Sequence, residues 1–187
     1  KLVPPMDFIP AAERYNLISI LDRWVVRNSL EMIANASRTA SGSTTFTINL
    51  SGQSLGDDSF LEHVLVAIDE TAVDARRVCF EITETAAIAN FSQASRFIQA
   101  LKELGCKFAL DDFGTGLSSF GYLKHFPVDF LKIDDSFVKG VLHDPIDREM
   151  VRSINEIGHL TGKQTIAEWA ENAEIIQMLT GLGVDYA

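Results

Sequence analysis

The stretch FSQASRFIQALKELGCKFALDD, residues 91–112, contains the two signals from which the fold can be predicted. Its first part has apolar residues near a period of 3.6 and stops at Gly105, which is typical of an amphipathic helix followed by a glycine. Its last part predicts a short buried strand at residues 107–111. The strand ends at Asp111 and Asp112, two adjacent carboxylates that repel each other and need a cation or hydrogen-bond donors to remain ionised. An isolated Asp-Asp pair is also typical of a surface turn, so this stretch alone leaves both interpretations open.

The same two signals alternate along the chain. Further strands are predicted at residues 44–50, 77–83, 129–134, 163–168 and 183–187, and further helices at residues 17–36, 147–162 and 172–183. In the helix at 17–36, Trp24 belongs to the apolar set, and we expect it in the core. Strands separated by single helices favour βα units with a mostly parallel sheet. The predicted fold class is therefore α/β, in one domain, because no linker or repeat interrupts the pattern.

Composition limits the possible partners. The chain has 187 residues, enough for one core but fewer than the roughly 250 of a complete α/β barrel. A net charge of −10 argues against a nucleic acid polymer or an anionic membrane surface as a partner, and an anionic ligand would need a bridge such as a metal ion. Cys79 and Cys106 lack metal-ligand spacing and predict buried thiols in a reducing cytoplasm. We expect a cytoplasmic chain, which leaves open a membrane anchor in other domains of a longer protein.

Polar residues lie where the predicted strands end. Strand alternation directs one residue at the end of each of five strands to a common face: Asn49, Glu81, Asp111, Lys132 and Glu168, with Asp112 beside Asp111. Functional sites gather at the carboxyl ends of parallel strands. Any one of these residues alone could be a rim residue or an ion-pair partner, but their coincidence favours a site. Four carboxylates, an amide and a lysine suit Mg²⁺ or Mn²⁺, and two such ions can hold a phosphodiester and activate water.

Four motifs carry a resemblance to a known family: FEITE (80–84), DDFGTGLSSF (111–120), PVDFLKIDDSFV (127–138) and TIAEWAEN (165–172). With their order and spacing, the whole chain resembles the EAL domain of bacterial cyclic di-GMP phosphodiesterases. The resemblance implies a modified TIM-type (β/α)8 barrel. It also implies that Mg²⁺ or Mn²⁺, as two ions, supports hydrolysis of cyclic di-GMP to linear pGpG in second-messenger signalling.

The resemblance also implies roles for individual residues. The implied metal ligands are Asn49, Glu81, Asp111, Asp112 and Glu168. Lys132 resembles the catalytic lysine that positions or deprotonates the attacking water. Glu168 resembles the acid that closes the metal-and-water network, with Glu171 as its catalytic neighbour near the substrate. Glu84 resembles the carboxylate that braces the loop after Asp112, and the expected substrate contacts are Asp134, Gly114 and Thr115.

The chain departs from the family pattern at both ends and at single positions within the motifs, Trp169 among them. The Glu-Ala-Leu segment belongs upstream of LVPP and a Gln-Gly-Tyr segment belongs after GVDYA, so we expect residues 1–187 to be an EAL domain incomplete at both ends and a poor enzyme alone. Trp169 stands where glycine is commonest, and it could narrow the pocket, stack on a guanine or pack outside the barrel.

The region SSFGYL (118–123) adjoins a loop that resembles a dimerisation region, so a homodimer is expected. GGDEF or sensor domains are expected in the full-length protein.

Two alternatives to a phosphodiesterase remain. One is an inactive EAL-type receptor that binds cyclic di-GMP without cutting it, which commonly lacks several of these acids. The other is an enolase-type lyase or racemase, which also uses a lysine and acid-bound Mg²⁺ on a barrel. The presence of Glu81, Asp111, Asp112, Lys132 and Glu168 favours the enzyme over the receptor. The adjacent aspartates suit two ions better than one, which disfavours the lyase.

Overall fold

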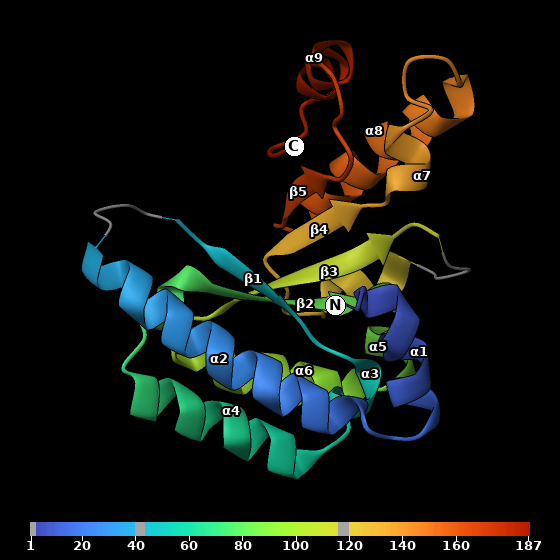
Figure 1. The fold of residues 1–187 in the computed structure, drawn as a ribbon. Coiled ribbons are helices and arrows are strands. Elements are labelled where there is room, and N and C mark those ends of the chain that lie inside the picture. The colour runs from blue at the N-terminus through green and yellow to red at the C-terminus, as the bar shows by residue number, and fades with distance from the viewer. Residues whose placement is uncertain (1–2, 40–43, 116–119) are drawn as a thin grey trace. The chain divides into compact units, whose positions relative to one another are not determined.

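The structure is a computed structural model that describes residues 3–39, 44–115 and 120–187. Helices and strands alternate along the chain (Figure 1). The chain divides into two compact units. The first unit comprises Lys1–Ile82 and Ala86–Lys107, and the second comprises Thr83–Thr85 and Phe108–Ala187.

The first unit is built on two parallel strands. β1 (Phe46–Asn49) pairs with β2 (Val78–Thr83), and the register places Asn49 opposite Glu81. The helical elements of this unit are α1 (Pro5–Arg14), α2 (Ile18–Thr39), α3 (Gly52–Leu55), α4 (Asp58–Thr71), the 3-10 helix η1 (Ala75–Arg77) and α6 (Phe91–Glu103), while α5 (Glu84–Ala89) begins in the second unit. Helices α2 and α4 lie side by side (Figure 1).

The core of the first unit is aromatic. The rings of Phe60 and Phe97 are stacked at 5.9 Å, and Phe80 meets Phe97 edge-on at 6.5 Å. All three side chains are buried, and such ring pairs add about 0.5–1.5 kcal/mol each to the stability gained from area burial. Phe97 of α6 therefore packs against Phe60 of α4 and Phe80 of β2 in one aromatic cluster.

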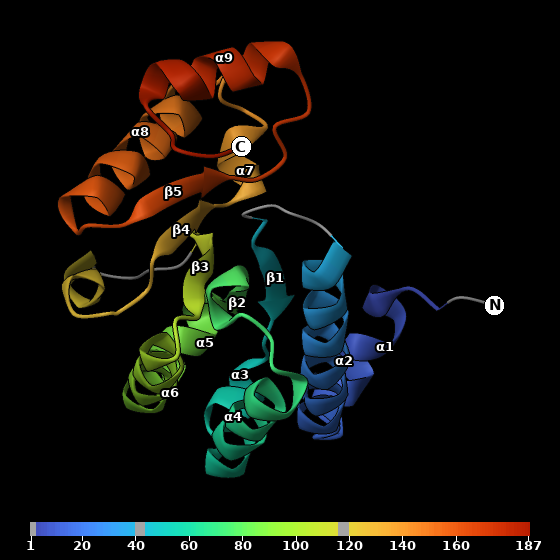
Figure 2. The ribbon, with the colours of Figure 1, turned by 90° about the vertical axis from the view of Figure 1, so that its left-hand side faces the viewer.

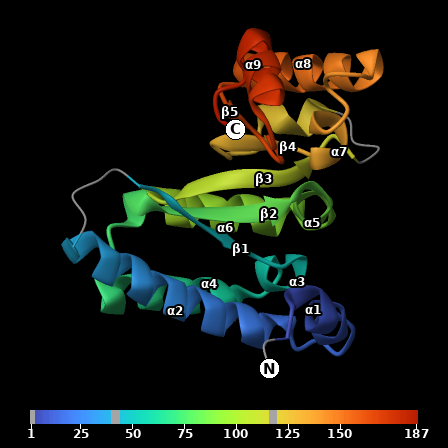
Figure 3. The same ribbon diagram turned by 45° about the horizontal axis from the view of Figure 1, so that its top comes forward.

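The second unit contains three parallel strands and the candidate site. β3 (Lys107–Phe113), β4 (Phe130–Ile133) and β5 (Gln164–Ala167) are adjacent in that order. The other elements are the 3-10 helix η2 (Phe120–Lys124), α7 (Asp135–Val138), α8 (Pro145–Leu160) and α9 (Ala173–Leu182). Helix α8 packs along β4 and β5 (Figure 2), and α9 lies beside α8 (Figure 3). A Cβ at Gly158 would lie 2.9 Å from Thr165 Cγ2, so glycine permits the close approach of α8 to β5.

A polar cluster holds the segment after α9 against β5. Asp185 accepts a hydrogen bond from the Thr165 backbone N–H at 2.7 Å and from His159 Nε2 at 2.9 Å. The Thr165 hydroxyl donates to Asn155 Oδ1 at 2.6 Å. The strand predicted at 183–187 is reduced to a single bridge between Tyr186 and Ile166. The segment is therefore held by the side-chain hydrogen bonds of Asp185 together with two backbone hydrogen bonds of Tyr186, to the Thr165 carbonyl and from the Ala167 N–H.

The predicted α/β alternation is confirmed, but the burial of one side chain was predicted wrongly. The expectation of a buried Trp24 is wrong, because its side chain is 64% exposed. Val26, two residues further along α2, is fully buried, and residues two apart on a helix point roughly 160° from each other. The buried face of α2 is therefore narrower than its apolar set. Cys79 and Cys106 are buried free thiols, as predicted. In the described ranges, every helix is too short or too polar to cross a bilayer.

Candidate metal site

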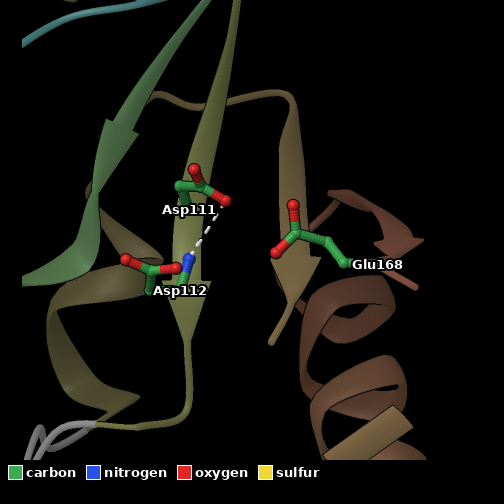
Figure 4. A group of neighbouring side chains, drawn as sticks. All are labelled: Asp111, Asp112 and Glu168. Carbon is green, nitrogen blue, oxygen red and sulfur yellow. Dashed lines mark hydrogen bonds between the residues drawn. The ribbon is translucent and has the colours of Figure 1, made fainter. Parts of the chain in front are cut away.

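A bulge in β3 allows two adjacent aspartates to serve one site. Leu110 is opposite Leu131 and Phe113 is opposite Ile133, so Asp111 and Asp112 together face the one residue Lys132. An extra residue of this kind interrupts the regular alternation of side chains between the two faces of a strand. Asp112 has a φ of +54°, in the left-handed region that aspartate adopts more readily than most residues. Its backbone N–H donates to Asp111 Oδ1 at 3.1 Å (Figure 4).

Three carboxylates form a cluster at the ends of these strands. Asp111, Asp112 and Glu168 each offer one oxygen, and these oxygens lie within 4.8 Å of one another. The two aspartates come from β3 and Glu168 directly follows β5 (Figure 4). Carboxylate oxygens are the preferred ligands of Mg²⁺ and similar hard cations. The arrangement can therefore hold a divalent cation, as the strand-end pattern predicted.

Lys132 lies between two members of the cluster. Its Nζ is 2.8 Å from Asp111 Oδ1 and 2.7 Å from Glu168 Oε1, and its side chain is only 11% exposed. Partly buried ion pairs are screened less by solvent and salt than surface pairs. One ammonium against three carboxylates still leaves an excess of negative charge, which a cation would offset.

The electrostatics of Asp112 reflect this excess. Partial burial of its carboxyl group raises the pKa of Asp112, and the charges of Asp111, Asp134 and Glu168 raise it further, while Lys132 acts in the opposite direction. Repulsion among like charges at close range disfavours the ionised form unless a cation is present. The site thus has the electrostatic character of a cation-binding centre.

Glu84 connects the two described segments that flank residues 116–119. Its Oε2 accepts from the Gly114 backbone N–H at 3.2 Å, and its Oε1 accepts from the Tyr122 hydroxyl at 2.5 Å. The Glu84 side chain is buried. Burial of the Tyr122 hydroxyl, together with its hydrogen bond to Glu84, raises the pKa of Tyr122. The Glu84 carboxylate thus contacts both ends of the segment that we expected it to brace. Gly116 of the FGTG motif, and Ser118 and Ser119 of the region linked to dimerisation, lie outside the described residues.

The predicted substrate contacts lie around the cluster. Gly114 has a φ of +100°, and a Cβ there would come within 2.8 Å of Ile154 Cδ1. The Thr115 hydroxyl donates to the Asp112 carbonyl at 3.0 Å. Asp134 caps α7 by accepting from the Ser136 N–H at 2.9 Å. Their contact with a substrate stays a prediction.

Three predicted residues are not members of this cluster. Asn49 and Glu81 belong to the first unit, where they are register partners, with Glu81 buried and Asn49 exposed. Their role as metal ligands stays a prediction. Glu171 is exposed, and its backbone N–H donates to the Trp169 carbonyl at 2.8 Å. The three-carboxylate cluster does not include it.

Strand-end reasoning missed Tyr122 and Lys139. Tyr122 lies in η2 and reaches Glu84, while Lys139 follows α7 and lies over the ring of Trp169. Neither residue ends a strand, so the pattern that found the acids carried no signal for them. Their contacts depend on pairings between segments far apart in the chain.

Fold and site together define the class of protein: an α/β protein with a cluster of three carboxylates, able to hold a cation, at the carboxyl ends of parallel strands. The family model of the EAL domain matches residues 1–187, and the chain belongs to the EAL domain family. This finding confirms the resemblance carried by the four motifs.

Individual relatives agree with this assignment. The chain is 39% identical to the cyclic di-GMP phosphodiesterase PdeB of Shewanella oneidensis, over 100% of the chain and 22% of that protein. It is 36% identical to the cyclic di-GMP phosphodiesterase PdeF of Escherichia coli, over 100% of the chain and 25% of that protein. A solved structure of the PaMucR phosphodiesterase in complex with c-di-GMP matches with a TM-score of 0.91 and 27% identity, over 97% of this chain and 74% of that one. The chain has the fold of an EAL domain and spans about a quarter of the length of PdeB and PdeF.

Proposed function

We propose that this chain is the catalytic part of a phosphodiesterase that hydrolyses cyclic di-GMP to linear pGpG with Mg²⁺ or Mn²⁺. The observation that carries the proposal is the cluster of Asp111, Asp112 and Glu168 with Lys132 between two of its carboxylates. The named activity of the relatives supports the same reaction.

The chemistry of the donor set fits two divalent ions. We assign Asp111, Asp112 and Glu168 as ligands, together with Asn49 and Glu81 from the ends of β1 and β2. Bound divalent ions supply Lewis acidity, which offsets phosphate charge and makes water a better nucleophile. The carboxylates hold and orient this charge, and their excess over Lys132 is the reason for the metal requirement.

Lys132 orients the attacking water and offsets charge on the phosphodiester. Two carboxylates lie within hydrogen-bond distance of its ammonium group, which donates hydrogen bonds. In this role Lys132 donates hydrogen bonds and contributes positive charge. Glu168 contacts the Lys132 ammonium opposite Asp111 and, in the proposed complex, closes the network of metal ions and water. Glu171 lies near the substrate in the proposed complex, while Gly114, Thr115 and Asp134 contact it along the rim.

Cleavage is the property that separates the proposal from its alternatives. The assay is conversion of cyclic di-GMP to pGpG by the protein that contains this chain, with Mg²⁺, with a chelator and with Ca²⁺. We expect turnover with Mg²⁺ alone, because Ca²⁺ takes longer bonds and a looser geometry. Metal-dependent binding without cleavage would identify the receptor instead. The presence of Asp111, Asp112 and Glu168 favours the enzyme, because an inactive receptor commonly lacks several of these acids.

We also propose the context in which the chain acts. Because the chain spans 22–25% of the length of PdeB and PdeF, we propose a longer protein with GGDEF or sensor domains and a homodimeric assembly. The region that suggested the dimer, residues 118–123, is only partly described, so solution mass is the appropriate measurement.

A further inference from the structure

Trp169 is an exposed aromatic residue next to a site carboxylate. It directly follows Glu168, and 59% of it is exposed. Its φ is +59°, a left-handed conformation that costs a residue with a side chain roughly 1–2 kcal/mol. Residues held in such conformations are enriched at ligand and active sites. This position therefore combines backbone strain with an apolar surface that the fold leaves in solvent.

Lys139 holds one face of the Trp169 ring. Its Nζ lies 4.3 Å from the ring centroid and 2.6 Å from Asp135 Oδ2. A cation over an indole face is attracted by the ring quadrupole, and Trp is the best partner among the aromatic residues. The ion pair with Asp135 at the start of α7 fixes the position of the ammonium. The ring is thus oriented by one cation on one side.

The platform formed by Trp169 and Lys139 adjoins the cluster through two short connections. Trp169 is covalently next to Glu168, whose carboxylate is in the cluster. Lys139 follows α7, and Asp134, the N-cap of α7, lies near enough to Asp112 for its charge to act on that carboxyl group. Both halves of the platform therefore come from the segments that border the three carboxylates.

We propose that Trp169, supported by Lys139, stacks on a guanine base of the dinucleotide whose phosphodiester lies at Asp111, Asp112 and Glu168. This inference rests on the proposed function. Stacking of a base on an aromatic side chain is worth about 1–3 kcal/mol. Lys139 occupies one face of the indole, so the base stacks on the other face. The platform acts on substrate affinity, because in the proposed complex it contacts the base and not the phosphodiester.

The test compares W169A and W169F in the protein that contains this chain. Dissociation constants for cyclic di-GMP are measured with Ca²⁺, and KM and kcat with Mg²⁺. We expect W169A to raise the dissociation constant and KM about 10-fold and to leave kcat within about 3-fold. W169F keeps an aromatic surface and should stay within about 3-fold of wild type. W24A removes the other tryptophan of this chain, which is also exposed and lies in the first unit, and it should change none of the three constants.

Two further measurements make the result specific. The change of tryptophan fluorescence on adding cyclic di-GMP should disappear in W169F and persist in W24F. K139M removes the cation that holds the ring and should raise the dissociation constant for cyclic di-GMP, but less than W169A does. Cleavage by wild type together with unchanged affinity in W169A would overturn the platform and leave the proposed function standing. If wild type neither binds nor cleaves cyclic di-GMP, the proposed function and the platform both fail.

Discussion

Asp112 illustrates how one backbone angle determines the chemistry of a pair of residues. In a regular strand Asp111 and Asp112 would point to opposite faces. The bulge opposite Lys132, with a φ of +54° at Asp112, brings an oxygen of each into one group with Glu168. The left-handed angle is tolerated because the residue is an aspartate, so the residue type serves both the turn and the ligand set.

Asp111 should be indispensable for turnover and dispensable for folding. In D111N the shape is kept, but the charge that faces Lys132 and contributes to the cation site is lost. We expect turnover of cyclic di-GMP to fall at least about 100-fold, because small misplacements of reacting groups have effects of that size. Mg²⁺ titrations should show weaker binding, while circular dichroism and the melting temperature stay close to wild type.

The matched control for this substitution is E149Q. Glu149 is an exposed acid of the same unit, 3.6 Å from Arg152, and its exposed ion pair contributes little. E149Q should behave as wild type in every assay. A folded D111N protein with near-normal turnover would contradict the metal site.

At the scale of elements, Glu84 connects parts of the chain that are distant in sequence. The start of α5 supplies the carboxylate, the end of β3 supplies the Gly114 N–H, and η2 supplies the Tyr122 hydroxyl. The buried Glu84 carboxylate accepts two hydrogen bonds, so its burial is compensated. The Gly114 N–H and the Tyr122 hydroxyl in turn have Glu84 as their acceptor. The position of the β3 end therefore depends on a residue outside the cluster.

Removing Glu84 should loosen both of its partners. E84A leaves the Gly114 N–H and the Tyr122 hydroxyl without this acceptor, at about 1–3 kcal/mol for each group that stays unsatisfied. We expect faster hydrogen exchange at Gly114 and a parallel loss of Mg²⁺ affinity and turnover. Y122F removes one of the two bonds and should produce a smaller change in each measurement. Lost activity with unchanged exchange at Gly114 would instead indicate a direct chemical role for Glu84.

At the scale of the whole molecule, charge limits what the chain can bind. The net charge of −10 opposes polyanions, and Lys132 and Lys139 of the second unit are already engaged by carboxylates and, for Lys139, by Trp169. The expectation that the chain does not bind a nucleic acid polymer stays a prediction. A small dinucleotide can still be held where divalent ions bridge its phosphates to the acids.

The stability of the whole protein should depend on pH through Asp185. Burial raises the pKa of Asp185, but hydrogen bonds from the Thr165 backbone and His159 outweigh it and lower the pKa overall. A lowered folded-state pKa means that the ionised form stabilises the fold above the ordinary value of about 4, and that this contribution disappears as pH falls through the folded-state value. D185N should therefore be less stable than wild type by about 1–2 kcal/mol at pH 7.

Urea unfolding from pH 7 to pH 3 measures this contribution. The difference between wild type and D185N should shrink below about pH 4, where wild type also loses the charge. E149Q serves again as the control, with a small difference at every pH. A difference between wild type and D185N that stays constant over the range would show that the charge of Asp185 is not the cause.

Local signals explain which parts of the fold were predictable. The strands at 77–83 and 107–111 and the helix at 91–105 follow from periodicity and a terminal glycine, and the structure contains β2, β3 and α6 there. The burial of Trp24 was predicted wrongly because periodicity identifies an apolar set without saying which part of it meets a neighbour.

The α/β alternation, the EAL family and the acids and lysine at the strand ends could all be predicted from the sequence. These are properties of single segments: period, composition and the residue at which each strand stops. Only in the folded chain can one see that three carboxylates lie within 4.8 Å of one another, that Lys132 lies between two of them, and that Glu84 contacts Tyr122. The physical reason is that these contacts depend on strand register, on a bulge formed against β4 and on side chains brought together from distant segments, none of which a local pattern encodes.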